Sequence, residues 1–196
     1  MAAMQHVTRL CVYCGSAVGL DHRYEAAARE LGQALAKAGI ELVFGGGRVG
    51  LMGVLADAVL TAGGRVVGII PERLRDAELA HQGVTELVIA GSMHDRKRLM
   101  AERADAFAVL PGGIGTLDET FEILTWRQLG LHDKPIFLVD VAGYWQPLRD
   151  LLDHLAAHGF TAPLVPRLFE IVPGVAELMN TLVHTQPAGP PRSELL

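Results

Sequence analysis

Short β-rich segments alternate with helical segments along almost the whole chain, and this alternation constrains the fold more than any other feature. The β-rich segments are apolar and about five residues long, and we expect strands at Val7–Cys14, Ile40–Phe44, Arg65–Ile70, Thr85–Ala90, Ala106–Leu110, Pro135–Val139 and Leu168–Val172. Helices are expected between them, with a further helix closing the domain, at Asp21–Lys37, Leu51–Thr61, Met93–Arg103, Leu117–Leu129 and Tyr144–His158. Apolar strands separated by helices are typical of a parallel sheet that is covered on both faces. We therefore predict a single α/β domain with a doubly wound parallel sheet and helices on both faces.

Length and local composition set the bounds of this domain. A chain of 196 residues corresponds to one domain at roughly 150 residues per domain. We place the domain at residues 1–183, because residues 184–196 are rich in Thr, Gln, Pro, Gly and Ser and are expected to form a disordered tail. Within the domain, residues 72–83 match neither pattern and are interpreted as a loop with a short helical turn.

Charge and hydropathy exclude several classes of partner. The net charge is −5, and no stretch concentrates Lys or Arg, so the chain lacks the clustered cations that bind nucleic acid or an anionic membrane. No apolar run reaches the roughly 18–20 residues of a membrane span. The first ten residues lack the apolar region of a signal peptide, and we expect a cytoplasmic protein.

The two cysteines, Cys11 and Cys14, have C-x-x-C spacing but lie in an expected strand. Residues three apart in a strand point to opposite faces, with Cα atoms ~10 Å apart, beyond the reach of a disulfide. We expect buried thiols rather than a redox pair.

A first glycine-rich loop, Gly45-Gly46-Gly47-Arg48-Val49-Gly50, follows the second expected strand and opens a helix. It has the G-x-G-x-x-G spacing of dinucleotide-binding proteins, and Glu72, 22 residues after Gly50, stands where an acid would bind a ribose. One hypothesis is therefore an NAD(P)-dependent oxidoreductase. Against it, the usual fingerprint follows the first strand, and glycines also serve tight turns and close packing.

A second glycine-rich loop, Pro111-Gly112-Gly113-Ile114-Gly115-Thr116, leads from the fifth expected strand into a helix. Its N–H groups can converge on one anion, and the helix dipole favours negative charge there. Thr116 could cap the helix and donate its hydroxyl to a phosphate. No Lys follows the glycines as in a P-loop, which favours a monophosphate. The acids Asp118 and Glu119 point ~100° apart on a helix, so we expect one of them to face the site.

The helix expected at Met93–Arg103 follows Ser92, which we expect to cap it. Three adjacent cations, Arg96, Lys97 and Arg98, occur in this helix, before the fifth strand. Such a run most often forms a solvated helix face. Arg96 shares a face with Arg103, and Lys97 points elsewhere, but composition does not decide which cation turns inward.

Taken together, these segments resemble a known family. Arg96-Lys97 followed by Pro111-Gly112-Gly113-Ile114-Gly115-Thr116-Leu117-Asp118-Glu119 resembles the P-G-G-x-G-T-x-x-E signature of the LOG proteins, the cytokinin riboside 5′-monophosphate phosphoribohydrolases long labelled "possible lysine decarboxylase". The resemblance continues at Cys14-Gly15-Ser16, Phe44-Gly45-Gly46-Gly47, Gly50-Leu51-Met52-Gly53, Gly68-Ile69-Ile70-Pro71, Leu124-Thr125-Trp126 and His132-x-Lys134-Pro135. It covers nearly the whole chain and implies a Rossmann-like fold.

The resemblance implies hydrolysis of the N-glycosidic bond between an adenine-type base and ribose 5-phosphate, with Arg96 and Glu119 as the catalytic pair. It implies substrate binding by Gly46, Glu78, Lys97, Gly112, Gly113, Ile114, Gly115, Thr116 and Thr125. It also implies a homodimer, a nucleotide 5′-monophosphate as substrate, and neither a metal nor another cofactor. Whether the substrate is prenylated or plain AMP stays open, as does the individual role of Arg96. The chain departs from the family pattern in having Asp118 where Glu is usual.

Two further hypotheses need weighing. A non-catalytic nucleotide-binding or carrier protein would need the glycine-rich loop but no acid beside the sugar, so the presence of both Arg96 and Glu119 favours the enzyme. A lysine decarboxylase would need a buried lysine to form a Schiff base with pyridoxal phosphate. The three lysines, Lys37, Lys97 and Lys134, fit that role poorly from their sequence contexts.

Overall fold

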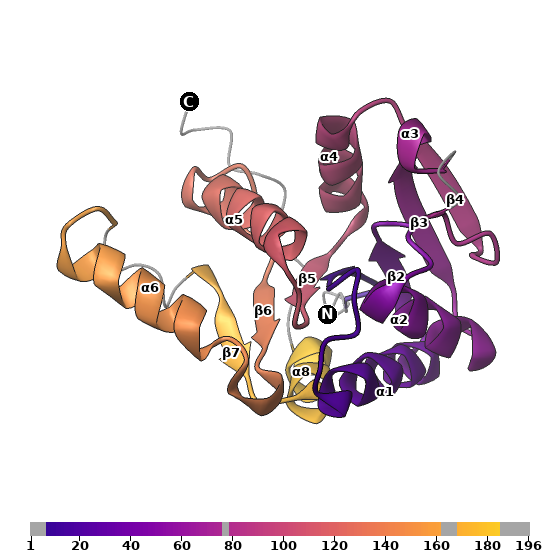
Figure 1. The fold of residues 1–196 in the computed structure, drawn as a ribbon, viewed down its shortest axis with the longest axis horizontal. Helices are drawn as coiled ribbons and strands as arrows, with labels where there is room; N and C mark the ends of the chain where they lie inside the picture. The colour runs from indigo at the N-terminus through magenta and orange to yellow at the C-terminus, as the bar shows by residue number, and fades with distance from the viewer. Residues whose placement is uncertain (1–6, 76–78, 162–167, 185–196) are drawn as a thin grey trace, which may run out of the picture.

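One parallel sheet forms the centre of the molecule. The computed structural model describes residues 7–75, 79–161 and 168–184. Within these ranges seven strands pair in the order β4-β3-β2-β1-β5-β6-β7 (Figure 1), and every neighbouring pair is parallel. They are β1 Arg9–Tyr13, β2 Glu41–Phe44, β3 Val66–Pro71, β4 Glu86–Ala90, β5 Ala106–Val109, β6 Ile136–Val139 and β7 Glu170–Val172. The predicted doubly wound α/β fold is confirmed.

Helices cover both faces of the sheet (Figure 1). They are α1 His22–Ala38, α2 Gly50–Thr61, α3 Glu72–Leu74, α4 Met93–Arg103, α5 Ile114–Gln128, the 3₁₀ turn η2 Val141–Gly143, α6 Gln146–Ala157 and α8 Val175–His184. Helices α1, α2 and α8 pack on one face, and α4, α5 and α6 pack on the other. Within the parts of the chain that the structure describes, no helix is long and apolar enough to cross a membrane.

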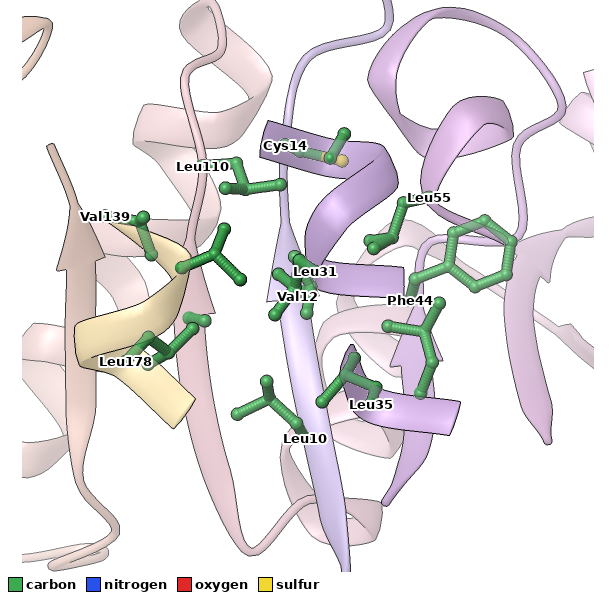
Figure 2. Packing of buried hydrophobic residues seen from close by; sticks show 14 of the residues in the cluster. Leu10, Val12, Cys14, Leu31, Leu35, Phe44, Leu55, Leu110, Val139 and Leu178 are labelled. Atoms are coloured by element: carbon green, nitrogen blue, oxygen red, sulfur yellow. The ribbon is translucent and has the colours of Figure 1, made fainter. Parts of the chain in front are cut away.

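Alternate residues of the buried strands supply the two halves of the core. Leu10 and Val12 of β1 belong to the same half of the core as Leu31 of α1 and Leu178 of α8 (Figure 2). Cys11, between them in sequence, belongs to the opposite half of the core. Cys14 lies on the Leu10 side, and both thiols are free and buried, which confirms the prediction from their spacing.

The order of the strands fixes where a ligand can bind. From β1 the chain moves outward through β2, β3 and β4, then returns to place β5 on the other side of β1. The two halves of the sheet therefore diverge between β1 and β5. In open α/β sheets ligands bind at the carboxyl ends of the strands at such a switch point. The loop after β5 lies at this point, whereas the loop Gly45–Gly50 follows β2, one strand away.

Local sequence signals explain several helix boundaries. The Asp21 carboxylate caps α1, Gly39 ends it with φ 69°, and the Ser92 hydroxyl caps α4 by accepting from the Asp95 N–H at 3.0 Å, as the sequence predicted for Ser92. The largest difference concerns α5, which begins at Ile114 instead of Leu117. Gly113 is the N-cap residue, and Thr116 lies inside the first turn, so the prediction that Thr116 caps this helix is wrong.

The remaining differences are small. Residues 72–83 contain the short helix α3, as predicted, and β3 includes Pro71, which pairs with Ala90 at the end of the strand. The helix predicted from Tyr144 begins at Gln146, after the turn η2. Helix α8 extends to His184, and the rest of the predicted tail lies outside the described residues, as does Glu78.

Candidate active site

A small cavity lies at the switch point of the sheet. Its volume is about 180 Å³, below the roughly 300–1,000 Å³ of most small-molecule pockets, so it can enclose only part of a nucleotide. It is lined by Cys14, Ser16, Met52, Met93, Arg96, Gly113, Ile114, Gly115, Thr116, Asp118 and Glu119. The residues come from the loops after β1 and β5 and from the starts of α2, α4 and α5. The second glycine-rich loop and Arg96, far apart in sequence, thus meet at one site.

Arg96 is the cation of α4 that lines the cavity. Its side chain is 11% exposed, and its Nε donates to the Ile69 carbonyl at 3.1 Å while Nη2 donates to the Gly45 carbonyl at 3.3 Å. A Cβ at Gly45 would overlap this guanidinium. The ends of β2 and β3 therefore hold the guanidinium in place, and the glycine at position 45 leaves room for it.

Arg96 and Glu119 form a buried ion pair across helices α4 and α5. Arg96 Nη1 lies 3.1 Å from Glu119 Oε1, and the glutamate side chain is 10% exposed. Burial raises the pKa of Glu119 above its ordinary value, and the neighbouring charge of Arg96 offsets part of this rise. A carboxylate with a raised pKa beside a guanidinium is an arrangement suited to accepting a proton.

The start of α5 offers donors for an anion. Leu117 N–H bonds to the Gly113 carbonyl, which closes the first turn of the helix and leaves the N–H groups of Ile114, Gly115 and Thr116 without an acceptor inside it. These three residues line the cavity. Together with the helix dipole they form a site of the kind that binds phosphate. Thr116 is buried, and its hydroxyl lies where a Cβ at Gly112 would stand.

Two predicted binding residues, Lys97 and Thr125, are not among those that line the cavity. The Lys97 amine lies 3.2 Å from Asp118 Oδ2 and 3.1 Å from Glu122 Oε2. Burial lowers the pKa of Lys97, but the hydrogen bonds to Glu122 and Asp118 outweigh it, and the pKa is raised overall. Thr125 is exposed, and its hydroxyl donates to the Phe121 carbonyl at 2.7 Å. Lys97 links α4 to α5 instead of reaching the cavity.

The first glycine-rich loop has structural reasons for its glycines. Gly46 and Gly50 have φ of 73° and 61°, and the Gly46 carbonyl accepts from the His81 N–H at 2.8 Å. A Cβ at Gly50 would overlap the backbone after β1, at Ser16. The loop packs β2 and α2 against neighbouring segments. Gly46 follows Gly45, whose carbonyl accepts from Arg96, but Gly46 is not among the residues that line the cavity.

Sequence reasoning did not assign a site role to Ser16, Met52 or Met93, which line the cavity. One signal was available, because Ser16 follows the first strand, and the carboxyl end of a central strand is where ligands bind. The Gly15 N–H donates to the Pro111 carbonyl at 3.0 Å and joins the two loops. Among the described residues, no group of three or more His, Cys, Asp or Glu side chains could hold a metal ion.

Comparison with known proteins places the chain among its relatives. Residues 52–182 match the family model described as "Possible lysine decarboxylase". The chain is 50% identical over 153 residues to the cytokinin riboside 5′-monophosphate phosphoribohydrolase of Rhodococcoides fascians, covering 78% of this chain and 77% of that protein. It is 43% identical over 174 residues to a protein of the same name from Arabidopsis thaliana, covering 89% and 82%.

Solved structures support the fold. The molybdenum cofactor carrier protein of Chlamydomonas reinhardtii superposes with a TM-score of 0.68 at 21% identity, covering 90% of this chain and 98% of that one. At that identity the likeness concerns the fold alone. The match to the family model over residues 52–182 and the identities of 43–50% to curated relatives show, beyond the fold, the family. The chain belongs to the LOG family, whose curated members are named cytokinin riboside 5′-monophosphate phosphoribohydrolases.

Proposed function

We propose that this chain hydrolyses the N-glycosidic bond of adenosine 5′-monophosphates, plain or N6-prenylated, and releases the free base and ribose 5-phosphate. The observation that carries the proposal is the buried Arg96–Glu119 pair, 3.1 Å apart, in a cavity bounded by the start of α5. The names of the relatives support it.

In this proposal, different parts of the site act on the phosphate and on the sugar. The N–H groups at the start of α5 bind the 5′-phosphate, and the cavity encloses the ribose beside Glu119. The bond between C1′ and the base nitrogen breaks with its electrons leaving on the base, so the sugar gains oxocarbenium character. The Glu119 carboxylate stabilises this positive charge and takes a proton from the water whose oxygen bonds to C1′. The departing base nitrogen takes up a proton, and Glu119 releases the one it took from water, so the carboxylate is regenerated.

Arg96 contributes in the same step. Its guanidinium is fixed by two backbone carbonyls, so it needs no rearrangement when charge develops nearby. We propose that it orients the Glu119 carboxylate and contacts the ribose or phosphate oxygens. None of the chain's three lysines lines the cavity, which leaves a lysine-dependent decarboxylation without its Schiff-base residue.

The direct test is incubation of the purified protein with AMP and with N6-isopentenyladenosine 5′-monophosphate. The expected result is equal molar amounts of free base and ribose 5-phosphate from one or both, and the ratio of kcat/KM values identifies the preferred substrate. Folded protein that binds AMP and releases no product would support the non-catalytic alternative. Saturable binding of NAD(P)H, followed by its fluorescence, would instead support the oxidoreductase.

The raised pKa of Glu119 predicts that the fall of kcat at acid pH has its midpoint at a higher pH than an ordinary glutamate would give. The carboxylate is the active form, so turnover falls as the pH drops through this pKa. Because burial raises the pKa, the midpoint is expected above the ordinary value of about 4.3. The measurement is kcat at saturating AMP against pH, so that ionisation of free AMP does not contribute. A midpoint at or below the ordinary value would contradict the role of Glu119.

Replacing Gly45 tests the support of Arg96 without changing either member of the pair. The methyl group of Gly45→Ala would overlap the guanidinium, and displacing it by even 1 Å is expected to lower kcat about 100-fold. Gly174→Ala, where an added Cβ meets nothing within 4 Å, is the matched control and should retain normal kcat. Similar kcat values for the two variants would show that the position of Arg96 does not limit turnover.

We also propose that the protein acts as a cytoplasmic homodimer. Three apolar residues of α5 and the turn after it are exposed, Ile114 at 85%, Leu129 at 62% and Leu131 at 47%. A second copy would bury them. Light scattering coupled to size-exclusion chromatography measures the mass, and about 42 kDa is expected, twice the chain mass of 21.0 kDa.

A further inference from the structure

Three consecutive carbonyl groups of the loop after β5 accept hydrogen bonds from different parts of the chain. The Pro111 carbonyl accepts from the Gly15 N–H at 3.0 Å, and the Gly113 carbonyl accepts from the Leu117 N–H at 3.0 Å. Between them, the Gly112 carbonyl accepts from the Tyr144 hydroxyl at 2.6 Å. The first and third bonds come from backbone N–H donors, so side-chain substitutions leave these donors in place. The middle bond depends on one side chain, 32 residues further along the sequence.

This middle bond fixes the direction of an amide at the candidate site. The Gly112 carbonyl and the Gly113 N–H belong to the same planar peptide, and in a trans peptide they point in opposite directions. The described residues contain no cis peptide bond. With the carbonyl held by Tyr144, the N–H of Gly113 therefore points away from Tyr144. Gly113 is the N-cap residue of α5 and lines the cavity.

Tyr144 is itself held firmly. Its ring makes edge contacts with Tyr24 of α1 and with Trp145, at centroid distances of 5.4 and 4.8 Å. Trp145 is 3% exposed, and its indole N–H donates to the Val109 carbonyl at 3.3 Å, at the end of β5. Tyr144 is thus held against α1 through Tyr24 and, through Trp145, against the end of β5, the strand that leads into the loop. It can hold the Gly112 peptide against rotation.

We propose that Tyr144 is a positioning residue that orients the Gly113 N–H toward the 5′-phosphate of the substrate. The identity of the substrate rests on the proposed function, whereas the geometry requires only a phosphate ester at the start of α5. Without the hydroxyl, the Gly112 carbonyl loses this donor and its peptide can rotate, so the amide is no longer pre-organised. Tyr144 is not among the residues that line the cavity beside Arg96 and Glu119. Its loss therefore weakens phosphate binding and leaves bond cleavage nearly unchanged.

The test compares Tyr144→Phe with Tyr24→Phe. Both variants keep an aromatic ring in the same edge contact, but among the described residues no hydrogen bond of the Tyr24 hydroxyl is seen, so only the first removes a bond. For Tyr144→Phe we expect KM for AMP and Kd for ribose 5-phosphate to rise about tenfold, with kcat within about twofold of wild type. Adenosine, which lacks the phosphate, should bind all three proteins equally well. A merely structural role would lower kcat and weaken adenosine binding too.

A second measurement needs no variant. In wild-type protein labelled with ¹⁵N, titration with ribose 5-phosphate is expected to shift the amide signal of Gly113. No shift of that signal, or equal Kd values for ribose 5-phosphate in the two tyrosine variants, would overturn the proposal.

These outcomes are distinct from failure of the proposed function. If the wild-type protein hydrolyses AMP while Tyr144→Phe binds ribose 5-phosphate normally, only the role of Tyr144 falls. If no AMP is hydrolysed, but Tyr144→Phe still loses affinity for ribose 5-phosphate, the role of Tyr144 stands and the reaction does not.

Discussion

Glu119→Gln is expected to lower kcat for AMP by about 10²–10⁴-fold, the range that a positioned general base contributes. Glutamine has nearly the same shape and can still accept a hydrogen bond from Arg96, but it can neither take a proton from water nor neutralise a positive sugar. Binding should persist, because the phosphate donors at the start of α5 are untouched. Product release measures kcat, and calorimetry measures the Kd of AMP.

Glu102→Gln is the matched control for this prediction. Glu102 is also a glutamate paired with an arginine, Arg98 Nη1, at 2.7 Å, but this pair is exposed on the outer face of α4. Its loss should leave kcat within about twofold, since exposed ion pairs contribute little. Full activity in Glu119→Gln would show that another group acts as the base.

Arg96→Ala is expected to reduce both activity and stability. The guanidinium stabilises charge in the site, and its removal should lower kcat/KM by about 10²–10³-fold. It also leaves the Glu119 carboxylate buried without its partner, which typically costs about 3–5 kcal/mol of unfolding free energy. The Ile69 and Gly45 carbonyls lose a donor as well. Urea unfolding measures the stability, and AMP turnover measures the activity.

The stability loss in Arg96→Ala should depend on pH. Burial already raises the pKa of Glu119, and without Arg96, whose charge lowers it, the pKa rises further. A group whose pKa is higher in the folded state binds more protons there, so stability falls as the pH rises through that pKa. We therefore expect a larger destabilisation at pH 8 than at pH 5.

Arg98→Ala, two residues along the same helix, serves as the control for both effects. Arg98 is exposed and pairs with Glu102, so we expect a change below about 1 kcal/mol. Equal stability losses in the two variants, or a loss in Arg96→Ala that does not change with pH, would contradict the buried pair as the cause.

Local sequence was sufficient where the physics is local. The alternation of apolar strands with helices predicted the parallel sheet, because strands buried on both faces have few other arrangements. Ser92 was predicted as the cap of α4 because a hydroxyl before a helix satisfies a free N–H group. The same reasoning failed for Thr116 as the cap of α5. The glycines before it are typical of a loop, but the helix already begins at Ile114.

The sequence by itself determined the fold class and the family resemblance, and it pointed to Arg96, Glu119 and the loop after β5 as the candidate site. Only the tertiary structure decided which of three adjacent cations lines the cavity. These three cations are adjacent in sequence but have different partners. Arg96 pairs with a buried glutamate, Lys97 with two carboxylates of α5, and Arg98 with an exposed glutamate of its own helix. Likewise, Tyr144 reaches Gly112 because β6 pairs beside β5, a contact no local pattern encodes. The physical reason is that these partners are set by how helices cross the sheet and by strand order, which bring together residues distant in sequence.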